Sequence, residues 1–193
     1  MEQSAATHAT PEPVPTDLFA RLADYERRSL VHDVGEAQRQ QKTSNWSGVG
    51  FRVATHRLAC RIDRIEEIIA PPPCTPIPGT RDWLLGIANV RGNLVPISDF
   101  GGYLSGNPTP ITARSRLILT RLQSRLAGLL VDEVLGQRHF HTDDLVNDDQ
   151  WANTPLAELV SQSFPAGDSS WGILDLERLE QRADFMNGAR DDD

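Results

Sequence analysis

Short stretches of alternating apolar and polar residues dominate the middle of this chain. Val49, Phe51 and Val53 occupy every second position, which is the spacing of a half-buried β-strand. Similar patterns predict a strand at about 57–62, strand hairpins within 83–98 and 116–135, and strands at 137–142 and 172–176. Turns rich in Gly and Pro separate these runs, which is typical of β-sandwiches and β-barrels.

Helical spacing is confined to a few segments. Apolar side chains within residues 18–30 can share one helical face, and Thr16 can cap the start of that helix. Shorter helical segments are expected at about residues 63–67, 156–160 and 176–185. Residues 71–78 are expected to be extended because proline fixes φ, and residues 101–112 to form a loop.

These patterns predict a mainly β domain with a helix on either side of the strand-rich region. The N-terminal residues are rich in Ala, Thr and Pro and show no apolar periodicity, so they are predicted to be disordered. The expected organisation is a disordered tail at 1–15, a helical extension and linker at 16–46, a folded domain at 47–186 and an acidic tail at 187–193.

The most informative segment is WLLGIANVRGNLVPISD, residues 83–99. Two apolar strands flank Gly92-Asn93, a Gly-X pair that suits the centre of a two-residue hairpin turn. Arg91 lies beside this turn, where a rigid hairpin would hold its planar fork of donors in a fixed place. Its side chain could pair with Asp99 across the hairpin, contact a partner protein, or do both.

Charge and composition narrow the possible functions. The formal net charge is −8, and the acidic residues are concentrated after about residue 140. This balance disfavours nucleic-acid binding, although a small-barrel nucleic-acid-binding protein remains the alternative from another class. The sequence has no apolar run long enough to span a membrane and no signal-peptide pattern. Two cysteines do not define a disulfide framework, so reduced thiols and a cytoplasmic location are expected.

Candidate catalytic and metal-binding groups are weak. His139 and His141 alternate on a predicted strand next to Asp143 and Asp144, but no ligand set with recognised spacing follows. Cys60 and His56 could form a nucleophile and base, yet nothing in the sequence supplies an orienting group. We therefore expect no catalytic residues, no metal site and no cofactor.

Residues 83–99 closely resemble the signature of the CheW family, the coupling proteins of bacterial chemosensory arrays. The signature positions are filled by Trp83, Gly86, Asn89, Arg91, Gly92, Pro96, Ile97 and Asp99. The resemblance continues in register at residues 61–68, 76–79, 128–135 and 173–179. It implies two intertwined SH3-like barrels of five strands each, with a C-terminal helix.

The same resemblance implies a non-enzymatic adaptor that links a methyl-accepting chemoreceptor to a CheA-type histidine kinase. The implied receptor-binding residues are Ile65, Glu67, Gly86, Val90 and Arg91. The implied kinase-binding residues are Val131, Asp132 and Val134, although Val131 could be a core residue and Asp132 a structural acceptor. Gly92, Asn93 and Asp99 are expected to be structural residues of the turn region.

The N-terminal segment suggests a particular subfamily. Its predicted helix, the polar linker and the following Trp-x-Gly-x-Gly-Phe resemble the adaptor of type IV pilus (twitching motility) chemosensory systems. The alternative within the family is a coupling protein of flagellar chemotaxis. Residues 143–170 depart from the family pattern, so the partner contacts known for the family are least applicable to this part of the chain.

Overall fold

Two five-stranded β-sheets account for most of the computed structural model, which describes residues 45–147, 149–166 and 169–190. Sheet A contains β1 (Asn45–Val53), β2 (His56–Arg61), β8 (Glu133–His141), β9 (Val160–Ala166) and β10 (Ser169–Leu174). Sheet B contains β3 (Ile65–Ile69), β4 (Leu84–Val90), β5 (Asn93–Asp99), β6 (Arg116–Leu122) and β7 (Arg125–Val131). The predicted mainly β fold is confirmed, whereas the expected tail and N-terminal helix lie outside the described residues.

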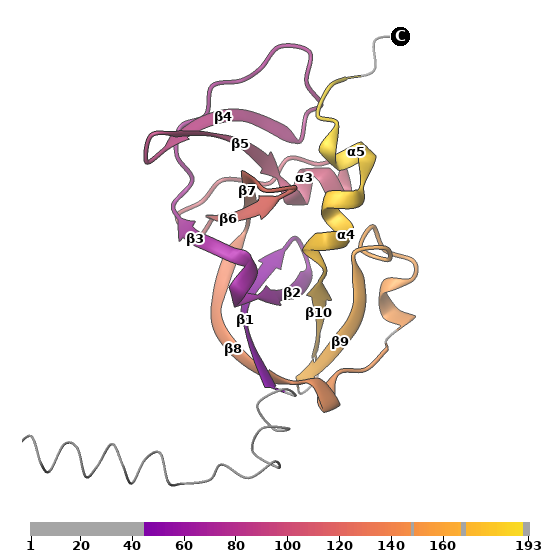
Figure 1. The fold of residues 1–193 in the computed structure, drawn as a ribbon. Helices are drawn as coiled ribbons and strands as arrows, with labels where there is room; N and C mark the ends of the chain where they lie inside the picture. Colours follow the sequence, from indigo (N-terminus) through magenta and orange to yellow (C-terminus); the bar gives the residue numbers. More distant parts are fainter. Residues whose placement is uncertain (1–44, 148, 167–168, 191–193) are drawn as a thin grey trace, which may run out of the picture. The chain divides into compact units, whose positions relative to one another are not determined.

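The two sheets are intertwined along the chain (Figure 1). The strand order is β8-β1-β2-β10-β9 in sheet A and β3-β6-β7-β5-β4 in sheet B. The chain therefore leaves sheet A after β2, builds all of sheet B, and returns to complete sheet A. Each sheet has one parallel pair, β2 with β10 and β5 with β7, and its other pairs are antiparallel.

The sheets share one plan, although the sequence shows no obvious repeat. The hairpin β1–β2 corresponds to β6–β7, and β9–β10 corresponds to β4–β5. A short helix follows the second hairpin in each case, namely α4 (Leu176–Gln181) after β10 and α3 (Phe100–Ser105) after β5. Asp175 and Asp99 cap these helices by accepting hydrogen bonds from backbone N–H groups of the first turn.

Among the described residues, the buried apolar side chains form three clusters. The largest, which we call the main core, contains residues of both sheets, such as Phe51 and Leu58 from sheet A and Ile118 and Leu129 from sheet B. The sheet B cluster is aliphatic and consists of Ala88, Val90, Val95, Ile97, Leu117, Leu119 and Leu130. The sheet A aromatic cluster consists of buried Ala59, Phe140 and Trp171 with partly buried Trp46, Leu135, Phe164, Ala166 and Ile173.

Glycines in β1 make room for the sheet A aromatic cluster. A Cβ atom at Gly50 would lie 2.3 Å from the Trp171 ring, and one at Gly48 would lie 2.6 Å from the Trp46 ring. Real Cβ atoms do not approach other atoms so closely, so larger residues would displace the rings. The absence of side chains at these two positions is therefore part of the packing of sheet A.

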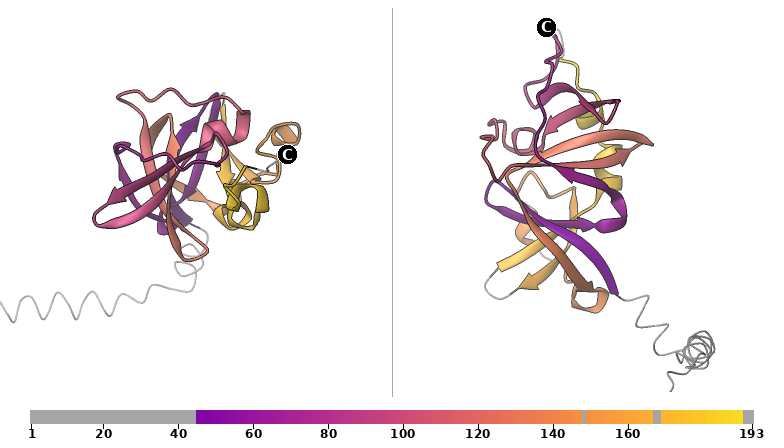
Figure 2. Two further views of the ribbon diagram at one scale, coloured as in Figure 1. Left: turned by 90° about the horizontal axis from the view of Figure 1, so that it is seen from above. Right: turned by 90° about the vertical axis from the view of Figure 1, so that its left-hand side faces the viewer.

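The C-terminal residues attach to sheet B and to α3. Helix α5 (Ala183–Met186) carries Phe185, which stacks on Trp83 with ring centroids 5.2 Å apart and meets Tyr103 edge-on at 4.9 Å. The Arg182 guanidinium donates to Asp184 and lowers the pKa of that carboxyl to about 2. Figure 2 shows α4 and α5 beside the strands, and backbone hydrogen bonds join residues 188–190 to residues 79–81.

Several predicted helices and loops were wrong. Residues 62–64 form a 3₁₀ turn, η1 (Ile62–Arg64), but the isoleucines that follow form strand β3, because their β-branched side chains pack between two apolar clusters. Residues 156–159 form turns, and Val160 begins β9. The expected loop at 101–112 begins inside helix α3. Strand 125–135 is interrupted at Asp132, where β7 ends and β8 begins.

The helix expected at 176–185 is confirmed as α4 and α5, with a break at Arg182. The two remaining 3₁₀ turns are η2 (Thr142–Asp144) and η3 (Asp149–Trp151).

Candidate partner-binding surfaces

The β4–β5 hairpin turns at Arg91 and Gly92, one residue earlier than predicted. Val90 pairs with Asn93, so Asn93 is the first residue of β5 and not a central turn residue. Arg91 has φ 53° and Gly92 has φ 86°, as a tight turn with two left-handed central residues requires. The Asn89 side-chain oxygen accepts a hydrogen bond of 2.8 Å from the Gly92 N–H. This bond helps to hold Arg91 in a conformation that residues with a Cβ atom seldom adopt.

Arg91 pairs with Glu67 and not with Asp99. Its Nη2 atom lies 2.6 Å from Glu67 Oε1, which joins the tip of the β4–β5 hairpin to strand β3. The Arg91 side chain is 76% exposed and that of Glu67 32% exposed, so the ion pair is open to solvent. The structure thus brings together two residues that were predicted separately for the receptor-binding surface.

The other three predicted receptor-binding residues lie in β3 and β4, the strands that carry or precede Glu67 and Arg91, and none of them is exposed. Ile65 is partly buried against the main core, and Val90 belongs to the sheet B cluster. Gly86 has φ +131°, and a Cβ atom there would lie 2.1 Å from the Thr75 carbonyl oxygen. Thr75 and Ile87 exchange two backbone hydrogen bonds at this point, which brings the segment after β3 to β4. Gly86 is therefore required for close backbone approach.

A bulge in β3 arranges two glutamates near the same edge of sheet B. The register with β6 shifts between Ile65 and Glu67, which leaves Glu66 as the extra residue. Glu66 accepts from Arg121 on β6 at 2.8 Å, while Glu67 accepts from Arg91. Both carboxylates thus lie on the surface with an arginine partner from a different strand.

Asp99 is structural, but it lies at the opposite end of β5 from the hairpin turn. It is 1% exposed and accepts from the Gly102 N–H at 2.9 Å, the Thr109 N–H at 2.7 Å and the Thr109 hydroxyl at 2.5 Å. These bonds cap α3 and fix the loop that follows it. The pairing with Asp99 that was one alternative for Arg91 does not form, because Asp99 is buried beneath this loop and Arg91 pairs with Glu67.

The predicted kinase-binding residues lie where the chain passes from sheet B back to sheet A. Val131 is 1% exposed and lies in the main core, and Val134 is partly buried against it. Asp132 accepts a 2.7 Å hydrogen bond from the Ala54 N–H and lies 3.4 Å from Arg52. Asp132 therefore holds the β1–β2 turn, in which Ala54 has φ 51°. The surface here is formed by Asp132, Val134 and that turn.

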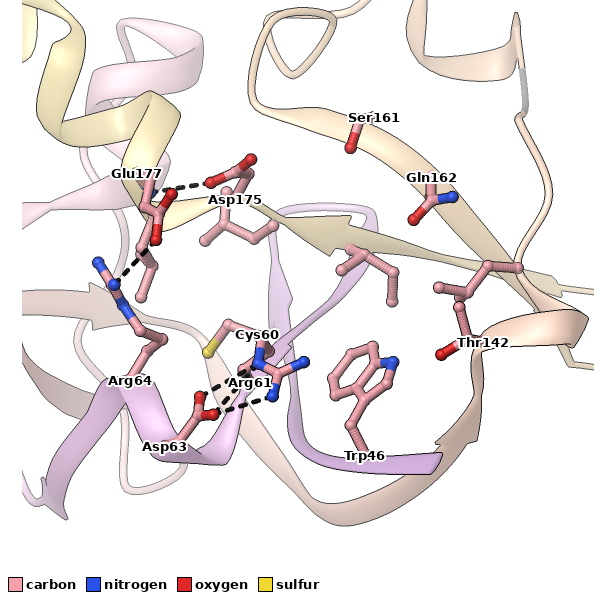
Figure 3. A pocket seen from close by; sticks show the side chains of 14 residues that line it. Trp46, Cys60, Arg61, Asp63, Arg64, Thr142, Ser161, Gln162, Asp175 and Glu177 are labelled. Carbon is pink, nitrogen blue, oxygen red and sulfur yellow. Dashed lines mark hydrogen bonds and ion pairs between the residues drawn. The ribbon is translucent and has the colours of Figure 1, made fainter. Parts of the chain in front are cut away.

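A cleft of about 510 Å³ lies beside the end of β2 (Figure 3). Trp46 lies on one side of it with the Arg61 guanidinium carbon 5.6 Å from its ring centroid, and Thr142, Ser161 and Gln162 lie across from them. Arg61 is bound to Asp63, which lowers the pKa of that carboxyl, and Arg64 pairs with Glu177. The charged groups at its rim are thus already paired within the chain.

The groups considered for catalysis or metal binding are separated or paired. Cys60 is buried, and this burial raises the pKa of its thiol to about 12, so the thiol stays protonated at neutral pH. His56 packs against the Trp151 ring, and His139 lies 3.0 Å from the Ser47 hydroxyl. Within residues 45–147, 149–166 and 169–190, no three His, Cys, Asp or Glu side chains are grouped so that they could hold a metal ion.

Comparison with known proteins identifies the class of this domain. The model of the family described as the CheW-like domain matches residues 47–184, and this chain belongs to that family. The chain is 30% identical to the protein PilI of Pseudomonas aeruginosa over 89% of its own length and 96% of that of PilI. It is 31% identical to the protein FrzA of Myxococcus xanthus over 69% of this chain and 84% of FrzA.

A solved structure has the same fold. The scaffolding protein TtCheW from Thermoanaerobacter tengcongensis superimposes with a TM-score of 0.64, covering 72% of this chain and 94% of TtCheW at 21% identity. In the part of the chain that the structure describes, no helix is long and apolar enough to cross a membrane.

Sequence reasoning missed several residues that shape these surfaces. Asn89 was recognised only as a signature position, and Thr75 and Thr109 were not singled out. The ion pair between Glu67 and Arg91 joins residues 24 positions apart in the sequence. The opposite charges of these two predicted site residues were the only signal that could have suggested it.

Proposed function

We propose that this chain is a non-enzymatic adaptor that couples a methyl-accepting chemoreceptor to a CheA-type histidine kinase in a pathway controlling type IV pilus twitching motility. One observation carries the pilus assignment. Residues 47–193 make up about three quarters of the chain, so a match to PilI over 89% must extend into the segment before residue 47. The segment before residue 47 lies outside the match to the family model, so it is shared with PilI beyond what family membership requires.

The flagellar alternative is supported over a smaller part of the chain. The chemotaxis protein CheW of Rhizobium meliloti is 36% identical to this chain, but over only 45% of its length. Family membership alone therefore fits both pathways. The extended match to PilI is the reason for preferring the pilus pathway.

The receptor-binding surface in this proposal is centred on Glu67 and Arg91. The Arg91 guanidinium has five N–H donors, and the ion pair with Glu67 occupies one side of it. Donors that remain exposed on a rigid hairpin can bind acceptors on a receptor at little cost in side-chain ordering. Ile65 and Val90 anchor β3 and β4 in the apolar clusters, and Gly86 allows the segment after β3 to pair with β4.

The kinase-binding surface in this proposal includes Asp132, Val134 and the β1–β2 turn. Val131 would support it from the main core, because its own side chain is not exposed. The two surfaces lie on one body whose sheets share a core. An adaptor of this kind, in the bacterial cytoplasm at receptor arrays, transmits a change only through contacts that differ between the two states of its partners.

The charge of Arg91 provides the test. Arg91→Ala is expected to weaken binding to the receptor's cytoplasmic domain by about tenfold, since charged hydrogen bonds contribute roughly 1.5–3 kcal/mol. The thermal unfolding midpoint should change little, because an exposed ion pair contributes about 0–1 kcal/mol to stability. Binding is measured by pull-down and titration calorimetry, with Arg125→Ala on β7 as the matched control.

A charge exchange separates partner binding from support of the hairpin. The double variant Glu67→Arg with Arg91→Glu keeps an ion pair but reverses its direction. Loss of receptor binding in this variant, with an unchanged melting curve, supports direct recognition. Unchanged receptor binding in both Arg91→Ala and the exchanged variant contradicts the assignment of this surface.

A further inference from the structure

A second cleft, on sheet A, has a different character from the partner-binding surfaces. It encloses about 510 Å³ between the outer strands β8 and β9. Its described lining includes Arg57, Arg138, His139, Phe140, Phe164 and Trp171. Among the described residues that line the cleft none is acidic, although the chain as a whole carries a formal net charge of −8. We propose that this cleft binds an extended acidic peptide segment of a partner protein.

The positive charge of the cleft is not neutralised within the described part of the chain. Arg138 lies over the Trp171 ring, with its guanidinium carbon 5.2 Å from the ring centroid. Arg57 donates to the Ser169 hydroxyl at 3.0 Å. Neither arginine has an ion pair with any carboxylate among residues 45–147, 149–166 and 169–190. By contrast, Arg61, Arg64, Arg91 and Arg121 each bind a glutamate or aspartate.

The strands that border the cleft favour an extended ligand. Sheet A has β8 and β9 as its two outer strands. Val146 already exchanges two backbone hydrogen bonds with Ser163 of β9, so a further segment would pair mainly with the edge of β8. A strand at a sheet edge exposes backbone donors and acceptors that another extended segment can pair with. Phe140 and Phe164 meet edge-on between these strands, with ring centroids 5.1 Å apart, and provide an apolar floor. An extended peptide would place alternate side chains toward the two arginines.

The acidic C-terminal tail of the same molecule is not the occupant in this proposal. Arg190, the last described residue before that tail, is held near sheet B by its bonds to Gly79 and Asp82. The cleft, in contrast, is formed by strands of sheet A. The proposal does not depend on the assignment of the receptor and kinase surfaces, because it uses none of their residues.

The experiment uses the full chain and a fluorescent peptide of about eight residues in which Glu and Val alternate. Binding is followed by fluorescence anisotropy at low salt, and the contact site by amide chemical shifts of residues 137–140, 164 and 166. Peptides with Lys or Gln in place of Glu test the charge, and a single-stranded oligonucleotide tests whether any polyanion binds. We expect the Glu peptide to bind and the Lys and Gln peptides to bind at least about tenfold more weakly.

Matched variants make the outcome decisive. The double variant R57Q/R138Q should bind the Glu peptide at least about tenfold more weakly, whereas R125Q, outside the cleft, should bind it normally. Circular dichroism establishes that each variant is folded. The proposal is overturned if the Glu peptide fails to bind at millimolar concentration, binds the double variant equally well, or shifts amides elsewhere. Tighter binding of the oligonucleotide would also overturn it, in favour of nucleic acid.

Discussion

Sheet A and sheet B have the same strand plan, but their interiors are packed in different ways. The sheet B cluster is built from aliphatic side chains, six of them no more than 2% exposed, and contains no aromatic ring. Sheet A uses Trp46, Phe140, Phe164 and Trp171, and all of these except Phe164 lie over glycines in β1. One arrangement of strands thus accommodates either many small apolar groups or a few large rings over a backbone without side chains.

This difference has a consequence for the surface. Aromatic rings between outer strands leave flat apolar faces that a charged group can cover, as Arg138 covers Trp171. In sheet B, aliphatic side chains are packed inside and leave no ring at the surface. The exposed groups of this sheet instead include charged side chains that form ion pairs between strands, such as Glu67 with Arg91. The two halves therefore suit different kinds of contact, although their topology is the same.

Truncating one core residue in each sheet tests the comparison most strongly. Phe140→Ala should reduce the free energy of unfolding by about 3–5 kcal/mol, and Leu130→Ala by about 2–5 kcal/mol. Phe140 should cost more because it stacks with Trp46 at 4.4 Å and contacts Phe164. Urea denaturation measures both values. A loss below about 1 kcal/mol for Phe140→Ala would mean that the aromatic cluster is not essential to sheet A.

Adding a methyl group beneath Trp171 tests the role of the glycines. Gly50→Ala should destabilise the protein by about 1–3 kcal/mol, because the new Cβ atom would overlap the indole ring. Combining it with Trp171→Leu, which removes that ring, should cost less than the sum of the two single changes. Denaturation curves of the three variants provide the cycle. Strict additivity would show that the glycine is not needed to accommodate the ring.

The reactivity of the two thiols compares the sheets without any mutation, so it has the smallest expected effect on the protein. Burial raises the pKa of Cys60 to about 12, so at pH 8 only roughly one thiol in ten thousand is ionised. Cys74 is only partly buried beside the sheet B cluster, so it should react first with iodoacetamide. The stability that comes from a protonated Cys60 is present below pH 9 and is lost as the pH rises toward 12. Mass spectrometry of the native protein checks the order, and faster labelling of Cys60 would indicate that sheet A opens readily.

The sequence predicted strands well where alternation or a turn marked them. The hairpin at 83–98 appears as β4 and β5, and the strand at 172–176 appears as β10, which begins three residues and ends two residues earlier than predicted. Strand β9 was missed because SQSFPA has little apolar periodicity and contains Pro165, which is tolerated at a sheet edge. The isoleucines of β3 follow helical spacing in the sequence, but they form a bulged strand because β3 pairs with β6 and packs against two apolar clusters.

The candidate surfaces were only partly predictable. The hydrogen bonds of the capping residue Asp99 depend on Thr109, across a loop that sequence patterns cannot fold. The plan shared by the two sheets was not visible either, because similar strand arrangements are filled with unrelated side chains. The expected roles of Glu67 and Arg91 remain a prediction that binding experiments must test.

The path of the chain also dictates when each half can assemble. The last strand of sheet B ends at Val131, so the whole of this sheet lies within the first 131 residues. In sheet A, by contrast, β2 pairs with β10, and the paired residues Leu58 and Gly172 are more than 110 positions apart. A nascent polypeptide leaving the ribosome can thus complete sheet B first, while β1 and β2 of sheet A remain without their other neighbours until β8, β9 and β10 have been synthesised. Until then, the edge of β2 is exposed to other chains, which makes this interval the moment of greatest aggregation risk.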